Sequence, residues 1–270
     1  MKAIGAGTII RRKPDGTLEC VTDEVTVEEP LEIRLGKNSL AVTMRTPGND
    51  EELTAGFLLA ENVIRSAHDL RELSHCTLPG SLGNVMNVSL VSEADIQLQS
   101  LQRYGTISSS CGLCGKTSIA AIHQHFPPIE ASTPIRLPLA TLLQLPDRLR
   151  SAQGNFDRTG GIHAAAIFDL ASDHMILRED IGRHNAVDKV IGRALLDGSL
   201  PLSNHVLMVS GRSSLEIVQK ALAARIAIVA SVSAPSSLAI NFARESGQTL
   251  IGFLRPPTFN IYSHVERVQL

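Results

Sequence analysis

Two cysteines, Cys111 and Cys114, stand three positions apart in a stretch that is rich in glycine and serine. Glycine and serine make a segment easy to bend, so we expect this pair to lie on a mobile loop that presents two thiols. Lys116 follows closely, and a neighbouring cation favours the thiolate, which is the nucleophilic form of cysteine. The spacing therefore predicts thiol chemistry, either a sulfur relay or a redox pair.

Three other interpretations of this segment remain open. The cysteines could be plain loop residues without a chemical role. They could bind zinc together with His123 and His125, although this spacing is not that of a common zinc finger. Residues 110–117 would match a P-loop only if Ser110 were glycine, so nucleotide hydrolysis is not favoured.

Composition excludes several classes of protein. The chain has 270 residues, a formal net charge of −2 and 3% aromatic residues, so broad binding to nucleic acid or to an anionic membrane is not expected. The sequence contains no apolar run long enough to cross a membrane, and its first residues lack the apolar core of a signal peptide. Four cysteines are too few for a disulfide scaffold, so we expect a cytoplasmic protein.

The first part of the chain predicts a small α+β domain over residues 1–103. Residues 28–35 and 39–46 have the pattern of two strands joined by a short turn. Asn49 or Asp50 is expected to cap a helix that follows, and residues 85–91 alternate as a further strand. Residues 104–135 then form the predicted cysteine loop and a linker, marked by three prolines.

The last part, residues 136–270, alternates strands and helices. Residues 164–170 and 175–179 predict a hairpin, which follows a helix over 139–149. Beyond the hairpin, helices are expected over 185–196, 214–224 and 236–245, and buried strands over 206–210, 226–232 and 249–254. This alternation predicts an α/β domain with a parallel sheet covered by helices.

Three segments that follow these strands could bind an anion at one edge of the sheet. The first holds Ser210, Gly211, Arg212 and Ser213, the second spans 231–237, and the third spans 252–257 with Arg255. Serine-rich helix starts and arginines suit phosphate. Alternatively, the serines are ordinary helix caps and the arginines are solvated.

The polar run 179–189 enters the first helix of this domain, and we expect Arg183 and His184 to lie beside the same edge. In the alternative interpretation, Asp180 or His184 caps that helix, while Arg183, Asp188 and Lys189 lie on the surface. A single histidine before the next strand, His163, is more typical of a structural role.

Taken in order, these motifs resemble those of the formate dehydrogenase accessory sulfurtransferases, the FdhD/NarQ family. The resemblance runs from about residue 20 to the end of the chain and includes residues 28–30, 56–61, 110–116, 160–166, 179–189, 209–216 and 252–255.

The resemblance implies a sulfurtransferase that takes sulfur from a cysteine desulfurase as a persulfide. It implies that the sulfur passes to the molybdenum or tungsten bis(molybdopterin guanine dinucleotide) cofactor of formate dehydrogenase, the client enzyme. Cys111 would carry the persulfide and Cys114 would assist. The cofactor would be a bound acceptor, with no metal bound directly by the protein, and its contacts would include Gly252, Phe253, Leu254, Arg255, Pro256 and Pro257.

The resemblance also implies a homodimer and a C-terminal domain with the three-layer fold of cytidine deaminases. The positions of the deaminase zinc ligands hold His184-Asn185-Ala186 and residues 211–215, where no cysteine occurs, so deamination is not expected. Two rival functions remain open. One is a non-catalytic chaperone that only binds the molybdenum cofactor, and the other is a thiol–disulfide oxidoreductase that uses the cysteine pair.

Overall fold

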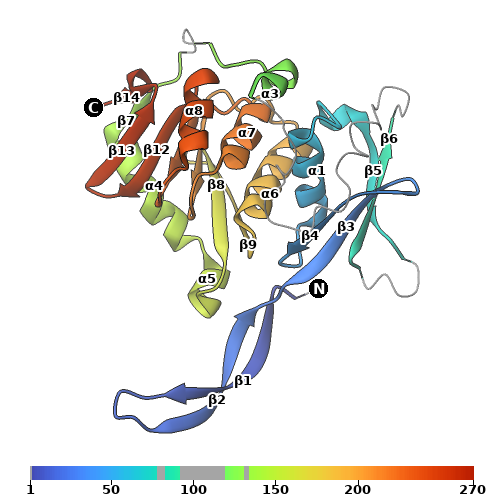
Figure 1. Ribbon diagram of the computed structural model, residues 1–270, viewed down its shortest axis with the longest axis vertical. Helices are drawn as coiled ribbons and strands as arrows, with labels where there is room; N and C mark the ends of the chain where they lie inside the picture. The colour runs from blue at the N-terminus through green and yellow to red at the C-terminus, as the bar shows by residue number, and fades with distance from the viewer. Residues whose placement is uncertain (1, 78–82, 92–118, 131–133) are drawn as a thin grey trace.

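A computed structural model describes residues 2–77, 83–91, 119–130 and 134–270 (Figure 1). The predicted cysteine loop, with Cys111, Cys114 and Lys116, lies outside the described residues. The described chain forms a mixed α/β structure with a four-stranded and a six-stranded sheet, and with two smaller two-stranded pairings.

The four-stranded sheet belongs to the N-terminal part of the chain. It contains β3 (Glu29–Leu35), β4 (Asn38–Arg45), β5 (Leu70–His75) and β6 (Val85–Leu90), in the order β4-β3-β6-β5. The predicted hairpin is confirmed as β3 and β4, and the predicted strand over 85–91 is β6. Sequence analysis did not identify β5, in which half of the residues are charged or histidine.

The helix α1 (Asp50–Ala60) follows this hairpin, as predicted, but neither expected capping side chain acts as a cap. Asn49 occupies the cap position with a left-handed backbone, and its side chain makes no cap hydrogen bond. The carboxylate of Asp50 instead accepts two hydrogen bonds from the buried guanidinium of Arg45, each at 3.0 Å. This pairing ties the start of the helix to β4.

A two-stranded arm projects from the body of the molecule (Figure 1). It consists of β1 (Ile4–Arg12) and β2 (Leu18–Thr26), which are antiparallel. Its base is held at α5 (Gly154–Thr159), where Arg158 pairs with Glu24 and the hydroxyls of Thr26 and Thr159 lie 2.9 Å apart.

The six-stranded sheet has the order β13-β12-β11-β10-β8-β9. The predicted hairpin is β8 (His163–Asp169) and β9 (Met175–Asp180). The predicted parallel strands are β10 (His205–Val209), β11 (Ile228–Ser231) and β12 (Thr249–Arg255), and β13 (Thr258–Ser263) adds an antiparallel edge that the sequence analysis missed.

The predicted helices of this part are also confirmed. They are α6 (Arg183–Leu196), α7 (Leu215–Ala223) and α8 (Ser237–Glu245), which lie beside one another against the sheet (Figure 1). The helix predicted over 139–149 is α4 (Leu139–Ser151), which packs against β8, β10 and β12. The remaining described elements are α3 (Ile119–His125), β7 (Leu137–Pro138), β14 (Val268–Gln269) and two short 3-10 helices over 67–69 and 265–267.

Two glycines allow α1 and α6 to cross with their backbones in contact. A Cβ atom on Gly56 would lie 2.0 Å from the carbonyl oxygen of Asp188, and one on Gly192 would lie 1.8 Å from that of Glu52. No side chain fits at either position without moving the helix backbones apart. The crossing joins the part of the chain with the small sheet to the part with the large sheet. Buried side chains of both parts form one continuous hydrophobic core, and the predicted domain boundaries stay a prediction.

Among the helices within the described ranges, none has both the length and the apolar character that crossing a membrane requires.

Candidate functional site at one edge of the large sheet

One edge of the six-stranded sheet collects most of the polar residues that the sequence analysis selected. The parallel strands β10, β11 and β12 all end there, and so does β9. Because β8 runs antiparallel to its neighbours, it begins at this edge with His163. The edge therefore holds Arg183 and His184 at the start of α6, and Ser210, Gly211, Arg212 and Ser213 after β10.

Backbone hydrogen bonds hold the three predicted segments together at this edge. The N–H of Ser213 donates to the carbonyl of Ala234 at 3.2 Å, and the N–H of Ser236 donates to the carbonyl of Ser213 at 3.0 Å. The N–H of Phe253 donates to the carbonyl of Ser233, also at 3.0 Å. The expected adjacency of the segments is thus confirmed, while their role in binding stays a prediction.

The third segment is not the open loop that the sequence analysis expected. Gly252 to Arg255 belong to β12, whose pairing with β13 is interrupted by a bulge, and Pro256 and Pro257 form the turn between the strands. The side chain of Leu254 is fully buried in the core, whereas Phe253 is 40% exposed. The Nε atom of Arg255 donates to the carbonyl of Val232 at 3.1 Å, which fixes this side chain against the second segment.

The serines at the two helix starts behave differently. The hydroxyl of Ser236 accepts a hydrogen bond from the N–H of Ala239, so Ser236 is an ordinary cap of α8. Ser214 occupies the same position before α7, yet its hydroxyl lies 2.9 Å from Nε2 of His184 instead. The N-terminal N–H groups of α7 are therefore not capped by a side chain.

His184 is a buried imidazole at this edge. Its Nε2 atom also lies 3.5 Å from a carboxylate oxygen of Glu216. Burial lowers the pKa of His184 to about 4, and the cations of Arg183 and Lys220 add to this effect against the opposing effect of Glu216. His184 is therefore uncharged at neutral pH, and it does not cap α6 with its side chain.

Two residues that the alternative interpretation placed on the surface are buried. Asp188 is 4% exposed and Lys189 is 1% exposed. Lys189 pairs with Asp180 at 2.7 Å, and Asp188 pairs with Lys220 of α7. The packing of α6 explains the error: Asp188 points toward α7 and Lys189 toward the end of β9, because α6 is covered by α1, α7, β8 and β9.

His163 is the residue of this edge that sequence reasoning did not select. A Cβ atom on Gly211 would lie 3.3 Å from its Nδ1 and 3.5 Å from Cδ of Arg183, so both side chains lie against that glycine. Besides its place in the family motif over 160–166, the signal was the position of His163 immediately before a predicted strand. The direction of that strand within the sheet, which brings His163 to the edge, is not readable from the local sequence.

The histidines considered for zinc have other contacts. Nε2 of His123 lies 2.9 Å from the hydroxyl of Ser246, and its ring stacks on Phe242. Nδ1 of His125 lies 3.0 Å from the side-chain amide nitrogen of Asn62. Within the described ranges, no group of three or more His, Cys, Asp or Glu side chains could hold a metal ion.

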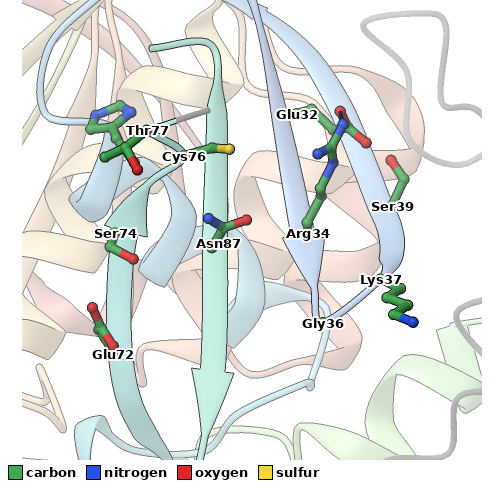
Figure 2. A pocket seen from close by; sticks show the side chains of 11 residues that line it. Glu32, Arg34, Gly36, Lys37, Ser39, Glu72, Ser74, Cys76, Thr77 and Asn87 are labelled. Atoms are coloured by element: carbon green, nitrogen blue, oxygen red, sulfur yellow. Dashed lines mark hydrogen bonds and ion pairs between the residues drawn. The ribbon is translucent and has the colours of Figure 1, made fainter. Parts of the chain in front are cut away.

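A groove of about 750 Å³ lies elsewhere, on the four-stranded sheet (Figure 2). Cys76, Asn87 and Lys37 are among its lining residues, together with an ion pair between Arg34 and Glu32 at 2.6 Å. Its charges are mixed and partly paired with one another. It shares no lining residue with the edge of the large sheet, so we treat that edge as the candidate site.

The sequence model of the FdhD/NarQ family matches residues 26–269. The chain belongs to the FdhD/NarQ family. Two curated members of it are named sulfur carrier protein FdhD. The one from Streptomyces avermitilis is 49% identical over 261 residues, which cover 95% of this chain and 93% of that protein. The one from Sulfolobus acidocaldarius is 42% identical, over 97% of each chain.

A crystal structure has a similar fold. It is that of a candidate formate dehydrogenase accessory protein from Desulfotalea psychrophila, with a TM-score of 0.75 and 24% identity over 99% of this chain and 100% of that one. The match supports the mixed α/β fold of the described residues. The family likeness stated from the motifs is confirmed.

Proposed function

We propose that this protein is a sulfur carrier in the maturation of formate dehydrogenase. The FdhD/NarQ membership and the names of the relatives support this role. The cysteine pair supplies a suitable chemical group, because a thiolate can carry sulfur as a persulfide. We propose a cysteine desulfurase as the donor and the molybdenum bis(molybdopterin guanine dinucleotide) cofactor, or its tungsten form, as the acceptor.

The transfer takes place in two balanced steps. The thiolate of Cys111 attacks the outer sulfur of the donor persulfide, so that Cys111 becomes a persulfide and the donor cysteine leaves as a thiolate. The thiolate of Cys114 then attacks the inner sulfur of this persulfide, which forms a Cys111–Cys114 disulfide and releases hydrosulfide for the acceptor. A dithiol reductant must return the disulfide to two thiols before the next cycle.

The edge of the large sheet would hold the nucleotide phosphates of the acceptor. The observation that carries this assignment is the Nε atom of Arg183, which is buried and has no hydrogen-bond partner in the described parts of the chain. The hydroxyl of Ser213, next to the uncapped start of α7, is likewise buried and without such a partner. Buried polar atoms are usually paired, so unpaired donors at a helix start suit a bound phosphate.

We also propose three properties that the family resemblance implies. They are a cytidine-deaminase-like C-terminal domain, assembly as a homodimer and a cytoplasmic location. We propose no deamination, since His184 is held by Ser214 and residues 211–215 contain no cysteine.

A complementation experiment tests the carrier role. Cells that lack the endogenous protein should regain formate dehydrogenase activity with the wild-type chain and with Cys76→Ala, but not with Cys111→Ala. Cys76 is the matched control, since it is a second cysteine away from the candidate site. Full activity of a Cys111→Ala/Cys114→Ala double variant would favour the cofactor-binding chaperone, in which the thiols have no chemical role.

A further inference from the structure

The imidazole of His163 is a polar group that the proposed function does not yet use. His163 begins β8 at the candidate edge and is half-buried. Its backbone position is fixed by pairing with Asp180 of β9, and the next residue is held by Ser210, whose hydroxyl accepts from the N–H of Ala164 at 2.9 Å. Yet neither ring nitrogen of His163 has a hydrogen-bond partner among the residues that the structure describes.

The side chain of Arg183 lies beside this ring. Both groups lie against Gly211, where a Cβ atom would lie 3.3 Å from Nδ1 of His163 and 3.5 Å from Cδ of Arg183. The Nε atom of Arg183 is the buried donor without a partner described above. An unused imidazole and an unused guanidinium donor therefore lie side by side, because the missing side chain of Gly211 lets both approach its backbone.

The charges around His163 favour an anion there. The ring faces Arg183 and the buried, uncharged His184 on α6, Asp180 on β9, and Arg212 in the segment after β10. Asp180 does not supply a free negative charge, because its carboxylate pairs with Lys189 at 2.7 Å and accepts from the N–H of Gly182. Two guanidinium groups thus act on the ring, against the single carboxyl group of Asp180.

The same surroundings keep the ring uncharged in the absence of a ligand. Burial lowers the pKa of His163, and the nearby cation of Arg183 lowers it further, while Asp180 acts in the opposite direction. A bound anion would reverse the electrostatic part of this effect, since it stabilises the charged imidazolium.

We propose that His163 and Arg183 together bind one phosphate group of a nucleotide, and that His163 takes up a proton when the phosphate binds. This inference rests on the proposed function for the identity of the acceptor, but it assigns His163 a role in binding that does not involve the cysteines. In the bound state the imidazolium and the guanidinium both donate to phosphate oxygens.

The affinity of this site for phosphate should depend on pH. The pKa of His163 is low in the free protein and higher in the complex, so binding takes up a proton at pH values between the two. Affinity should therefore increase as pH falls through this range. A rise of about one unit in the pKa would make affinity about tenfold higher at the low end of the range than at the high end.

Sulfate is a suitable probe, because it resembles phosphate and does not itself titrate near neutral pH. Histidine pKa values can be followed by NMR of the full chain labelled at the histidine ring carbon, with and without sulfate. We expect sulfate to raise the pKa of His163 by about one unit. His205 is the matched control: it is also half-buried and its pKa is also lowered by burial, but it begins β10 at the opposite edge.

Variants of His163 and Arg183 test whether these two residues cause the proton uptake. In His163→Gln, the pH dependence of sulfate affinity should disappear, whereas His205→Gln should retain it. In Arg183→Gln, sulfate should no longer raise the pKa of His163. An unchanged pKa of His163 in the presence of sulfate, or an unchanged pH dependence in His163→Gln, would overturn the proposal.

A competition experiment separates a nucleotide phosphate from a free oxoanion. Guanosine monophosphate should displace sulfate from His163 at a lower concentration than inorganic phosphate does at the same pH. Equal concentrations would overturn the assignment to a nucleotide. None of these measurements involves sulfur transfer, so a failure here leaves the carrier role to be decided by the cysteine variants.

Discussion

The ammonium group of Lys220 on α7 donates to both carboxylate oxygens of Asp188 on α6, at 2.8 and 2.9 Å. Glu216 lies 3.6 Å from the same ammonium group, and Glu61 after α1 also acts on it electrostatically. Burial would lower the pKa of Lys220, but these three acids outweigh burial and raise it. The buried ammonium group of Lys220 thus interacts electrostatically with three carboxyl groups near the start of α7.

The loss of this cation should destabilise the fold strongly. Lys220→Met leaves three acidic side chains around a buried site without a positive charge, and we expect a loss of about 3–5 kcal/mol in the free energy of unfolding. Asp188→Asn should cost much less, because Lys220 keeps Glu216 and the amide has nearly the shape of the carboxylate. Urea unfolding at pH 8 measures both values, and similar losses for the two variants would contradict this account.

The same cluster predicts a pH dependence of stability. Burial raises the pKa of Asp188 from its ordinary value of 3.8 to about 7, in spite of the opposing effect of Lys220. Between these values the folded state holds a proton that the unfolded state lacks, so the free energy of unfolding falls as pH rises, on the order of 1 kcal/mol per pH unit.

The difference between wild type and Asp188→Asn isolates this effect, since other titrating groups are common to both. From pH 5 to pH 7.5, the wild type should lose stability relative to Asp188→Asn. Unfolding by urea at several pH values gives the difference. A constant difference over this range would show that Asp188 is already ionised at pH 5.

The crossing of α1 and α6 predicts a sharp steric effect. In Gly192→Ala, the new methyl group would lie 1.8 Å from the carbonyl oxygen of Glu52, so the helix backbones must separate. We expect a loss of about 3 kcal/mol in the free energy of unfolding. Gly154→Ala is the control, since no atom lies within 4 Å of its added methyl group, and it should leave stability nearly unchanged.

The helices and parallel strands of the C-terminal part could be predicted from sequence, because their signals are local. Apolar runs, helical periodicity and serine or glycine at the ends place β10, β11, β12, α7 and α8 to within a few residues. The strand β13 and the arm strand β1 were not identified. Both strands are less buried than the central strands β10 and β11. Their formation depends on the strands with which they pair more than on their own sequence pattern.

The candidate edge was predictable only in part. The adjacency of the three segments follows from a parallel sheet, and the structure confirms it through the contacts of Ser213 and Phe253. The burial of Asp188 and Lys189, and the arrival of His163 at the edge, depend on how α6 packs and which way β8 runs. Those are long-range relationships, which no single stretch of sequence contains.

The most direct test of the carrier role is intact-protein mass spectrometry after incubation with a cysteine desulfurase and cysteine. We predict a mass gain of one sulfur atom that a thiol reductant removes. Cys111→Ala should show no gain, whereas Cys76→Ala and Cys20→Ala should gain sulfur as the wild type does. The absence of a sulfur adduct on the wild-type chain during desulfurase turnover would contradict the proposed sulfur transfer.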